Sequence, residues 1–279
     1  TASSPSCCDM PAAPPENDSS ISPASRIPAP PFAGLRHVEF PIAEVLPFLD
    51  KASLFRSRWQ YQKGQQSDAA YQTILETEAM PALEALLQRD RQEKIFRPQA
   101  AYGYFPCRRS GNELIILTQS GAEAGRFAFP RRSRKPQLCL SDYFRSDGTD
   151  LIGLWAVTVG SRASELAAEI YQQNHYRDYL HLHGLGIELA ETTAELLFRQ
   201  MQVELGFRPT ESGPDLVKAG LRYSFGYPAC PDLSQQKLLL ELVQAAKIGV
   251  SLTEAFVMVP EQSVSGIFIH HPEATYFAP

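Results

Sequence analysis

The sequence predicts an α+β fold: a single domain with a twisted antiparallel sheet flanked by helices. Segments with helical character come first, followed by strands, then helices, then strands again. Because helices and strands come in separate groups along the chain, an antiparallel sheet is favoured over alternating βαβ units. The strand-like segments also follow one another at hairpin spacing. No Gly-x-Gly-x-x-Gly motif is present, so a Rossmann-type domain is not expected.

The first half of the domain is predicted to hold two helical regions and four strands. Residues 42–57 form the first helix, and residues 67–94, rich in Ala, Leu, Glu and Gln, form the second. Pro81 marks a restart or kink in the second. Gly111-Asn112 makes a plausible hairpin turn. The predicted strands are 100–105, 113–118, 125–129 and 151–159.

The second half continues with helices and ends with strands. Residues 161–179 and 180–205 form two helices or one broken helix. Ser161 or Ser164 could cap the first, and Gly206 could close the second. An amphipathic helix at 234–247 and strands at 255–259 and 265–269 complete the prediction.

Composition excludes several classes of protein. The chain has 279 residues, 44% of them hydrophobic, and a net charge of −5. This is enough apolar content for a core. No basic stripe indicates a nucleic-acid partner, and no apolar run reaches the ~20 residues needed to cross a membrane. Five irregularly spaced cysteines argue against a disulfide framework. We therefore expect a reducing, cytoplasmic location.

Residues 1–28 are rich in Pro, Ser and Ala and poor in large apolar groups. Such a segment cannot bury enough surface to fold, so we predict a disordered interdomain linker. The domain itself is predicted to occupy residues 29–279. The simplest interpretation is that the chain is the C-terminal piece of a longer polypeptide, and a separately encoded subunit is the alternative.

The segment 222–232, RYSFGYPACPD, has the most distinctive chemistry. Its two prolines exclude a regular helix, and Gly226 can turn with positive φ or admit a close approach. Arg222 supplies a rigid fork suited to a carboxylate. On composition alone, a buried structural loop with a surface arginine is the better explanation of the segment.

Other candidate groups are weaker. Glu188, Glu191 and Glu195 share one helical face, and such a row is usually solvated. His181 and His183 point in different directions on a helix, so no metal site is predicted. His270-His271 is expected to be solvated or in the core. No catalytic constellation is recognised in the sequence.

The segment 222–232 resembles the signature Arg-x-x-x-Gly-Tyr-Pro-Ala-Cys-Pro-Asp of the C-terminal activation domain of cobalamin-dependent methionine synthase. Five further segments resemble other blocks of this family in the same order. They are PPFAG at 30–34, VLPFLD at 45–50, RPQAAYGYFP at 97–106, and the C-terminal blocks 251–260 and 263–278.

The resemblance implies a bound S-adenosylmethionine of a type unrelated to Rossmann methyltransferases. Arg222 would hold the ligand's carboxylate, Asp50 its ammonium or another donor, and Glu191 the ribose hydroxyls. Gly226 and Tyr227 would shape the adenosine side, and Tyr276 would lie near the reacting end. No residue of this chain is expected to be catalytic in a covalent sense.

The resemblance also implies partners. A cobalamin-binding module, covalently joined or separate, would supply the cobalamin, and flavodoxin or a similar donor would supply an electron. The domain would present the methyl group for reductive methylation of inactive cob(II)alamin. Leu233 and Val259 depart from residues frequent in the family. These departures motivate an alternative, a degenerate docking or regulatory subunit that does not bind S-adenosylmethionine.

Overall fold

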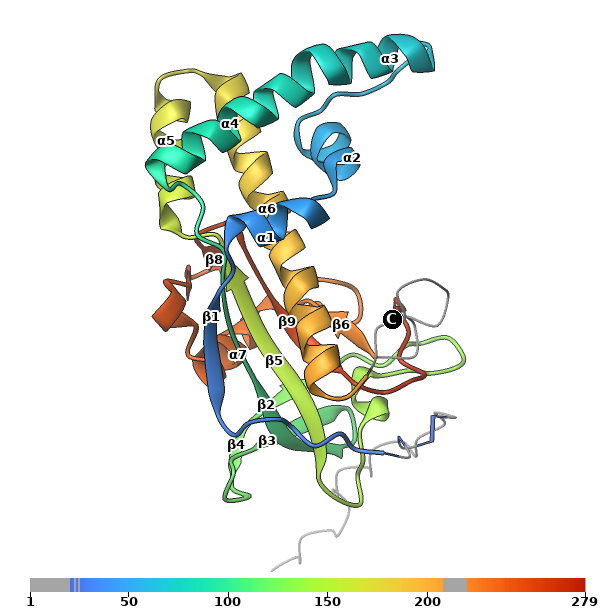
Figure 1. The fold of residues 1–279 in the computed structure, drawn as a ribbon. Helices are drawn as coiled ribbons and strands as arrows, with labels where there is room; N and C mark the ends of the chain where they lie inside the picture. Colours follow the sequence, from blue (N-terminus) through green and yellow to red (C-terminus); the bar gives the residue numbers. More distant parts are fainter. Residues whose placement is uncertain (1–20, 23, 25, 208–219, 279) are drawn as a thin grey trace, which may run out of the picture.

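The computed structural model describes residues 21–22, 24, 26–207 and 220–278, and it confirms the α+β fold (Figure 1). Most of the predicted linker, including Cys7 and Cys8, lies outside these residues. The described part contains a seven-stranded sheet in the order β4-β3-β2-β5-β9-β6, with β1 also pairing with β2. Every strand pair in this sheet is antiparallel, as predicted from the grouping of helices and strands along the sequence.

The sheet is organised around the long strand β2, which has different partners along one edge. Its first half pairs with β1 and its second half with β3, while β5 covers the opposite edge. The strands are β1 Leu35–Glu39, β2 Gln99–Ser110, β3 Glu113–Leu117, β4 Glu123–Ala128, β5 Asp150–Thr158, β6 Leu221–Tyr223 and β9 Ser263–Ile269, with a separate hairpin of β7 Ser251–Leu252 and β8 Met258–Val259.

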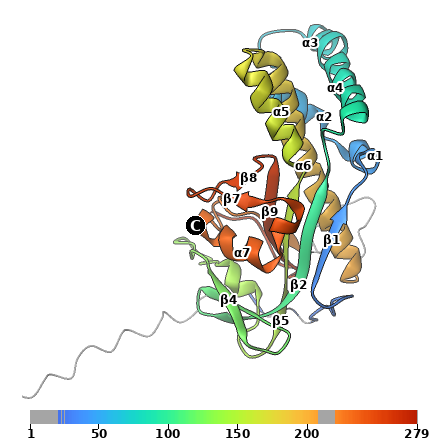
Figure 2. The ribbon, with the colours of Figure 1, turned by 90° about the vertical axis from the view of Figure 1, so that its left-hand side faces the viewer.

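The helices form an upper layer, and α6 and α7 lie on opposite faces of the sheet (Figures 1 and 2). The upper layer packs residues 54–59, α4, α5 and the start of α6 around one apolar cluster. The helices are α1 Ile42–Val45, α2 Lys51–Ser53, α3 Asp68–Ile74, α4 Met80–Glu93, α5 Ser161–Gln172, α6 Tyr176–Glu204 and α7 Gln236–Leu242. Short 3-10 or π turns are η1 Leu46–Phe48, η2 Leu54–Arg58, η3 Leu75–Ala79, η4 Leu140–Tyr143, η6 Leu233–Gln235 and η7 Ala245–Ile248.

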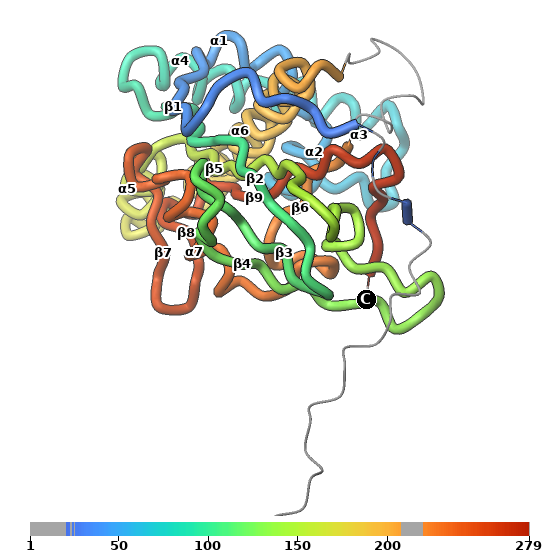
Figure 3. The backbone as a smooth tube through the Cα atoms, turned by 90° about the horizontal axis from the view of Figure 1, so that it is seen from below, coloured from blue at the N-terminus to red at the C-terminus, as the bar shows by residue number. Residues whose placement is uncertain are grey.

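Alternation along the strands gives the sheet two apolar faces. Tyr102, Tyr104 and Trp155 face α6, whereas Ile152 and Leu154 of the intervening positions join the core with α7. The view from below shows the same layers, with α6 on one side of the sheet and α7 on the other (Figure 3). The long α6 therefore links the upper helical layer to one face of the sheet.

The break between the second pair of helices lies earlier than predicted, at residues 173–175 and not at 179–180. Asn174 has φ 62°, and its N–H bonds to the Tyr171 carbonyl while His175 N–H bonds to that of Ile170. This is a Schellman cap built on asparagine. The Ser161 or Ser164 cap is also wrong, because Gly160 stands at the N-cap without a side-chain bond.

Other element predictions succeed or fail for local reasons. Gly111-Asn112 does connect β2 and β3, and Gly206, with φ 76°, follows the end of α6 as predicted. The predicted strand 255–259 shrinks to β8, because Phe256 has φ 59° within a turn closed by the Thr253 N–H to Val257 carbonyl bond. The helix predicted at 234–247 is α7 flanked by η6 and η7. Strands β1, β6 and β7 were not predicted.

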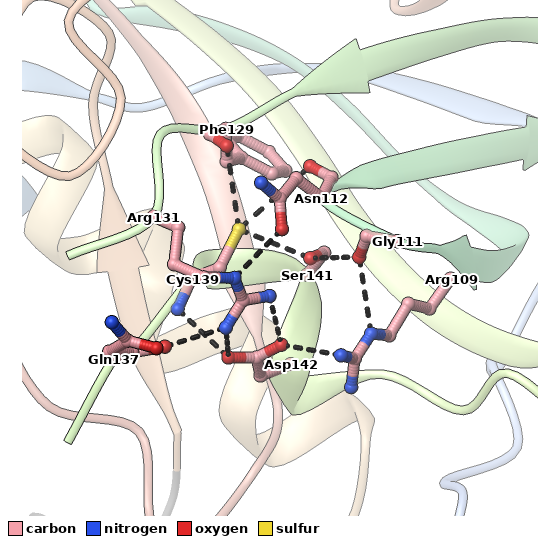
Figure 4. Close-up of polar contacts among 9 residues, drawn as sticks. All are labelled: Arg109, Gly111, Asn112, Phe129, Arg131, Gln137, Cys139, Ser141 and Asp142. Carbon is pink, nitrogen blue, oxygen red and sulfur yellow. Dashed lines mark hydrogen bonds and ion pairs between the residues drawn. The ribbon is translucent and has the colours of Figure 1, made fainter. Parts of the chain in front are cut away.

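A buried carboxylate fixes the loop after β4 to the β2–β3 hairpin (Figure 4). Asp142 is 0% exposed and accepts two hydrogen bonds from Arg131, at 2.7 and 2.8 Å. Its Oδ1 also lies 2.7 Å from Nη2 of Arg109 on β2. The nearby thiol of Cys139 bonds to the Phe129 carbonyl, and burial raises its pKa. This cluster is structural, since one buried carboxylate is shared between two arginines from different segments.

The described residues just before position 29 lie against the domain. The Ser22 carbonyl accepts a hydrogen bond from His271 Nε2 at 2.9 Å, and the Ala24 carbonyl accepts one from Arg145 at 2.7 Å. Ile27 packs on the aromatic cluster beneath α6. Among the described residues, no helix is long and apolar enough to cross a bilayer.

Candidate functional site

Arg222 lies on β6, the edge strand of the sheet, opposite Phe268 of β9. Its neighbour Tyr223 is buried in the core on the α7 face. Because successive side chains of a strand point to opposite faces, Arg222 points to the α6 face. Its side chain is 23% exposed, so the guanidinium is partly withdrawn from solvent.

Two carboxylates of α6 approach this guanidinium. Glu191 Oε2 lies 3.6 Å from Nη1 and Glu195 Oε2 lies 3.7 Å from Nε. They are one helical turn apart and therefore share a face. Both distances exceed hydrogen-bond length, so these are ion pairs with room between the groups.

The chain after Arg222 closes a tight turn that exposes an aromatic ring. Gly226 has φ 89°, a backbone conformation that favours glycine. Its N–H bonds to the Cys230 carbonyl at 2.9 Å, and the Cys230 N–H bonds back to the Tyr227 carbonyl at 2.9 Å. Tyr227 at the tip is 63% exposed. The prolines and glycine thus build a rigid turn, as the sequence suggests.

A cavity of about 550 Å³ opens between this turn, α6 and the C-terminal segment. Tyr276 fixes the C-terminal segment, because its hydroxyl donates to the Arg222 carbonyl at 2.9 Å. The pKa of Tyr276 is raised, because desolvation by burial outweighs the opposing effect of the positive charge of Arg222. The lining residues are Glu191, Arg222, Tyr223, Ser224, Tyr227, Pro228, Ala229, Tyr276, Phe277 and Ala278.

The structure brings together four of the six predicted site residues. Glu191, Arg222, Tyr227 and Tyr276 all line this cavity. Gly226 forms the turn that carries Tyr227 but does not itself line the cavity.

Asp50, the sixth predicted residue, does not line the cavity. It caps α2, where its side chain accepts the Ser53 N–H at 2.9 Å. The Ser53 hydroxyl in turn donates to Glu188, which also pairs with Arg58 at 3.2 Å. The end of the first helical region therefore contacts α6 one turn before Glu191.

Sequence reasoning overlooked the role of Glu195 and of the residues around Tyr276. The spacing places Glu195 one turn after Glu191 on the same helical face, but a solvated row is expected from the sequence, because the spacing does not reveal the partner Arg222. Phe277, Ala278 and Ser224 line the cavity only because the C-terminal segment folds back beside β6. No local pattern in the sequence indicates that return.

The histidines of α6 have structural partners. His181 lies 4.4 Å from the ring centre of Trp59, and burial lowers its pKa. His183 stacks on Tyr179, and its Nδ1 lies 2.8 Å from Gln262 Nε2. Within the residues described, no group of three or more His, Cys, Asp or Glu side chains could hold a metal ion.

The arrangement is suited to binding a polar organic molecule. Ligand cavities of about 300–1,000 Å³ commonly combine apolar walls with a few polar groups. Here aromatic rings form the walls, and Arg222 and Glu191 offer opposite charges. Cys230 lies close by, but burial raises the pKa of its thiol to about 12, so it is protonated at neutral pH.

Comparison with known proteins gives one consistent result. Residues 41–279 match the family described as vitamin B12 dependent methionine synthase, activation domain. Methionine synthases of Mycobacterium tuberculosis (strain ATCC 25618 / H37Rv) and Mycobacterium leprae (strain TN) are 36% and 34% identical over 276 residues. Each alignment covers 90% of this chain but 23% of the relative, so the chain spans about a quarter of their length.

A solved structure shares the fold. It is a MetH reactivation domain bound to AdoHcy, with a TM-score of 0.75 and 28% sequence identity. The alignment covers 91% of this chain and 82% of that domain.

Proposed function

Because this chain belongs to the family of activation domains of vitamin B12 dependent methionine synthase, we propose that it binds S-adenosylmethionine beside Arg222. It would present the methyl group for reductive methylation of inactive cob(II)alamin and so reactivate methionine synthase for methionine biosynthesis. AdoHcy is what S-adenosylmethionine becomes after losing its methyl group. The similar domain that carries AdoHcy therefore supports this ligand class.

The observation that carries the proposal is the partly buried fork of Arg222 inside a cavity of suitable size. A guanidinium binds a carboxylate with two parallel hydrogen bonds, which gives both strength and orientation. In the proposed complex Arg222 holds the methionine carboxylate, and Glu191 contacts the ribose or the cationic end. Tyr227 and Gly226 form the wall for the adenosine, and Tyr276 lies toward the sulfonium.

Asp50 has a less direct place in the proposal. It lies at a helix end joined to α6 through Ser53 and Glu188. We assign it to the ammonium of the ligand, which requires the ligand to extend from the cavity toward α2.

The domain contributes positioning and not bond chemistry. S-adenosylmethionine supplies the methyl group, a neighbouring module supplies the cobalamin, and flavodoxin or a similar donor supplies the electron. Holding two reactants in line lowers the entropic part of the barrier. The chain is accordingly a module of a methyltransferase and not a complete catalyst, in keeping with its 23% share of the relatives.

Two further assignments belong to this proposal. Residues 1–28 would join the domain at residue 29 to the preceding module and permit the rearrangement that brings cobalt to the methyl group. A cytoplasmic location is supported by Cys107, Cys139 and Cys230, which are free thiols.

Isothermal titration with S-adenosylmethionine tests the proposal. We expect saturable binding that Arg222→Ala weakens at least tenfold, since a charge-assisted contact contributes about 1.5–3 kcal/mol. Arg97→Ala is the control, because Arg97 pairs with Glu39 and does not line the cavity. Absence of binding by the intact chain would reject the proposal in favour of a docking or regulatory subunit.

A further inference from the structure

Arg222 does not face the cavity alone, because three charged side chains of α6 form a chain with it. Glu195 Oε2 approaches Arg222 Nε at 3.7 Å, while its other oxygen accepts a hydrogen bond from Arg199 Nε at 3.2 Å. Glu195 is therefore shared between two arginines. Glu191 approaches Arg222 at Nη1 and has no second arginine or lysine among its ion pairs in the described structure.

The atoms involved show how a carboxylate must approach. Elsewhere in this molecule Arg126 meets Glu123 through Nε and Nη2, and Arg131 meets Asp142 through Nη1 and Nη2. A guanidinium thus has two edges that can bind a carboxylate with two bonds, and they share Nη2. On Arg222, Glu195 stands at the Nε edge and Glu191 at the Nη1 edge.

A carboxylate that binds Arg222 with two hydrogen bonds occupies one of these edges, and it therefore competes with the glutamate that stands there at 3.6 or 3.7 Å. Displacing Glu195 costs less, because Glu195 keeps its hydrogen bond to Arg199. Glu191 lines the cavity, where the proposed function gives it a contact with the ligand, whereas Glu195 is not a lining residue and can turn toward Arg199. The ligand's carboxylate therefore replaces Glu195 at the Nε edge of Arg222.

We propose that Glu195 is a positioning residue that holds Arg222 beside the cavity until a ligand binds, and that the ligand's carboxylate then replaces Glu195 at the Nε edge. This inference rests on the proposed function and goes further, because it assigns a competitor inside the site. The competition lowers the affinity for ligands with a carboxylate and leaves other ligands unaffected. Arg199 sets the strength of the competition by offering Glu195 an alternative partner.

The test compares S-adenosylmethionine with its decarboxylated form, which keeps the sulfonium, the amine and the adenosine. Glu195→Gln removes one negative charge, and this change acts on both cationic ligands. The ratio of their dissociation constants reports on the carboxylate, and the double-variant cycle with Arg199 separates competition from the difference of one net charge between the ligands. We expect Glu195→Gln to shift this ratio about two- to fivefold in favour of S-adenosylmethionine, the range for a partly exposed ion pair.

Arg199→Gln gives the opposite prediction. Without Arg199, Glu195 is held more firmly on Arg222, so the ratio shifts toward the decarboxylated ligand. In the double variant Glu195→Gln, Arg199→Gln this shift disappears, because the competitor is absent. Glu93→Gln is the matched control, since Glu93 forms a similar exposed i,i+4 pair with Arg89 on α4.

The outcomes separate this inference from the proposed function. If the intact chain binds S-adenosylmethionine but Glu195→Gln leaves the ratio unchanged, the competition is refuted and the proposed function stands. If Glu195→Gln weakens both ligands equally, Glu195 is structural and the inference is again refuted. Circular dichroism and thermal unfolding establish that each variant is folded before its ratio is interpreted.

Discussion

Individual charged residues in this domain act through partners that are distant in sequence. Arg222 obtains its orientation from Glu191 and Glu195 on α6 and from the hydroxyl of Tyr276 on its carbonyl. Asp142 likewise holds Arg109 and Arg131, which come from opposite ends of the β2–β4 region. In each case the sequence gives the charge of the residue, but it does not predict which distant residue it contacts.

At the residue scale, Asp142→Asn is expected to lower the free energy of unfolding by about 3 kcal/mol. The substitution keeps the side-chain shape but leaves two buried arginines without their counter-charge, which is the costly way to break a buried pair. Urea denaturation measures the change. Glu39→Gln should cost less than about 1 kcal/mol, because Glu39 and Arg97 are both exposed. Equal effects of the two variants would contradict this assignment.

At the element scale, the turn after β6 connects a strand to the cavity wall. β6 has three residues and pairs only with β9 in the described structure, so the turn must be rigid by its own composition. Gly226 provides the positive φ, and the Cys230 thiol closes the turn by bonding to the Ser224 carbonyl at 2.9 Å. The element therefore positions Tyr227 by its own backbone and thiol bonds, while Phe225 and Ala229 anchor it in the core with α7.

Gly226→Ala tests this element. A residue with a Cβ at φ 89° is strained by roughly 1–2 kcal/mol, and its Cβ would lie 3.0 Å from Leu233. We expect roughly tenfold weaker S-adenosylmethionine binding, since the turn relaxes by moving Tyr227. Gly249→Ala is the control for strain, because Gly249 has φ 77° with open space around it and does not line the cavity. It should lose stability and keep its affinity.

At the scale of the whole molecule, a buried hydrogen-bonded pair of side chains joins distant parts of the chain. His270 at the end of β9 contacts Asp150 at the start of β5 at 2.7 Å, and both are almost fully buried. The same carboxylate accepts the backbone N–H of Arg145, whose side chain bonds to the Ala24 carbonyl. The end of β9, the loop before β5 and the segment preceding residue 29 are thus connected through the carboxylate of Asp150.

Acid unfolding tests this connection. Burial alone raises the pKa of Asp150, but the hydrogen bond and charge of His270 and two backbone N–H groups outweigh it, so its pKa is lowered. A folded-state pKa below the unfolded value stabilises the protein above the unfolded pKa, about 3.9, and the stability is lost as pH falls through the folded pKa.

We therefore expect the free energy of unfolding to decline below about pH 4, and to decline less steeply in Asp150→Asn. At pH 7 this variant should already be about 1–3 kcal/mol less stable, because it loses buried hydrogen bonds. Urea denaturation at a series of pH values measures both. If the free energy of unfolding of the variant declines as steeply below pH 4 as that of the intact protein, other carboxylates determine the acid unfolding.

The sequence by itself determined the fold class, the main strands, the turn at Gly111-Asn112 and the family of the chain. These depend on local signals: hydrophobic periodicity, turn residues, and the ordered strings around Arg222. It also singled out four of the residues that line the cavity. Each of these features depends on residues that are close together in the sequence, so the sequence is sufficient to predict it.

Only the tertiary structure decided the rest. It placed the short strand β6 beside β9, set Glu195 against Arg222, and brought Tyr276 back to the Arg222 carbonyl. It also showed that Asp50 caps α2 away from the cavity lining. These features arise from contacts between segments distant in the chain. Such contacts form when the apolar faces of the sheet and α6 pack together, and no local pattern encodes them.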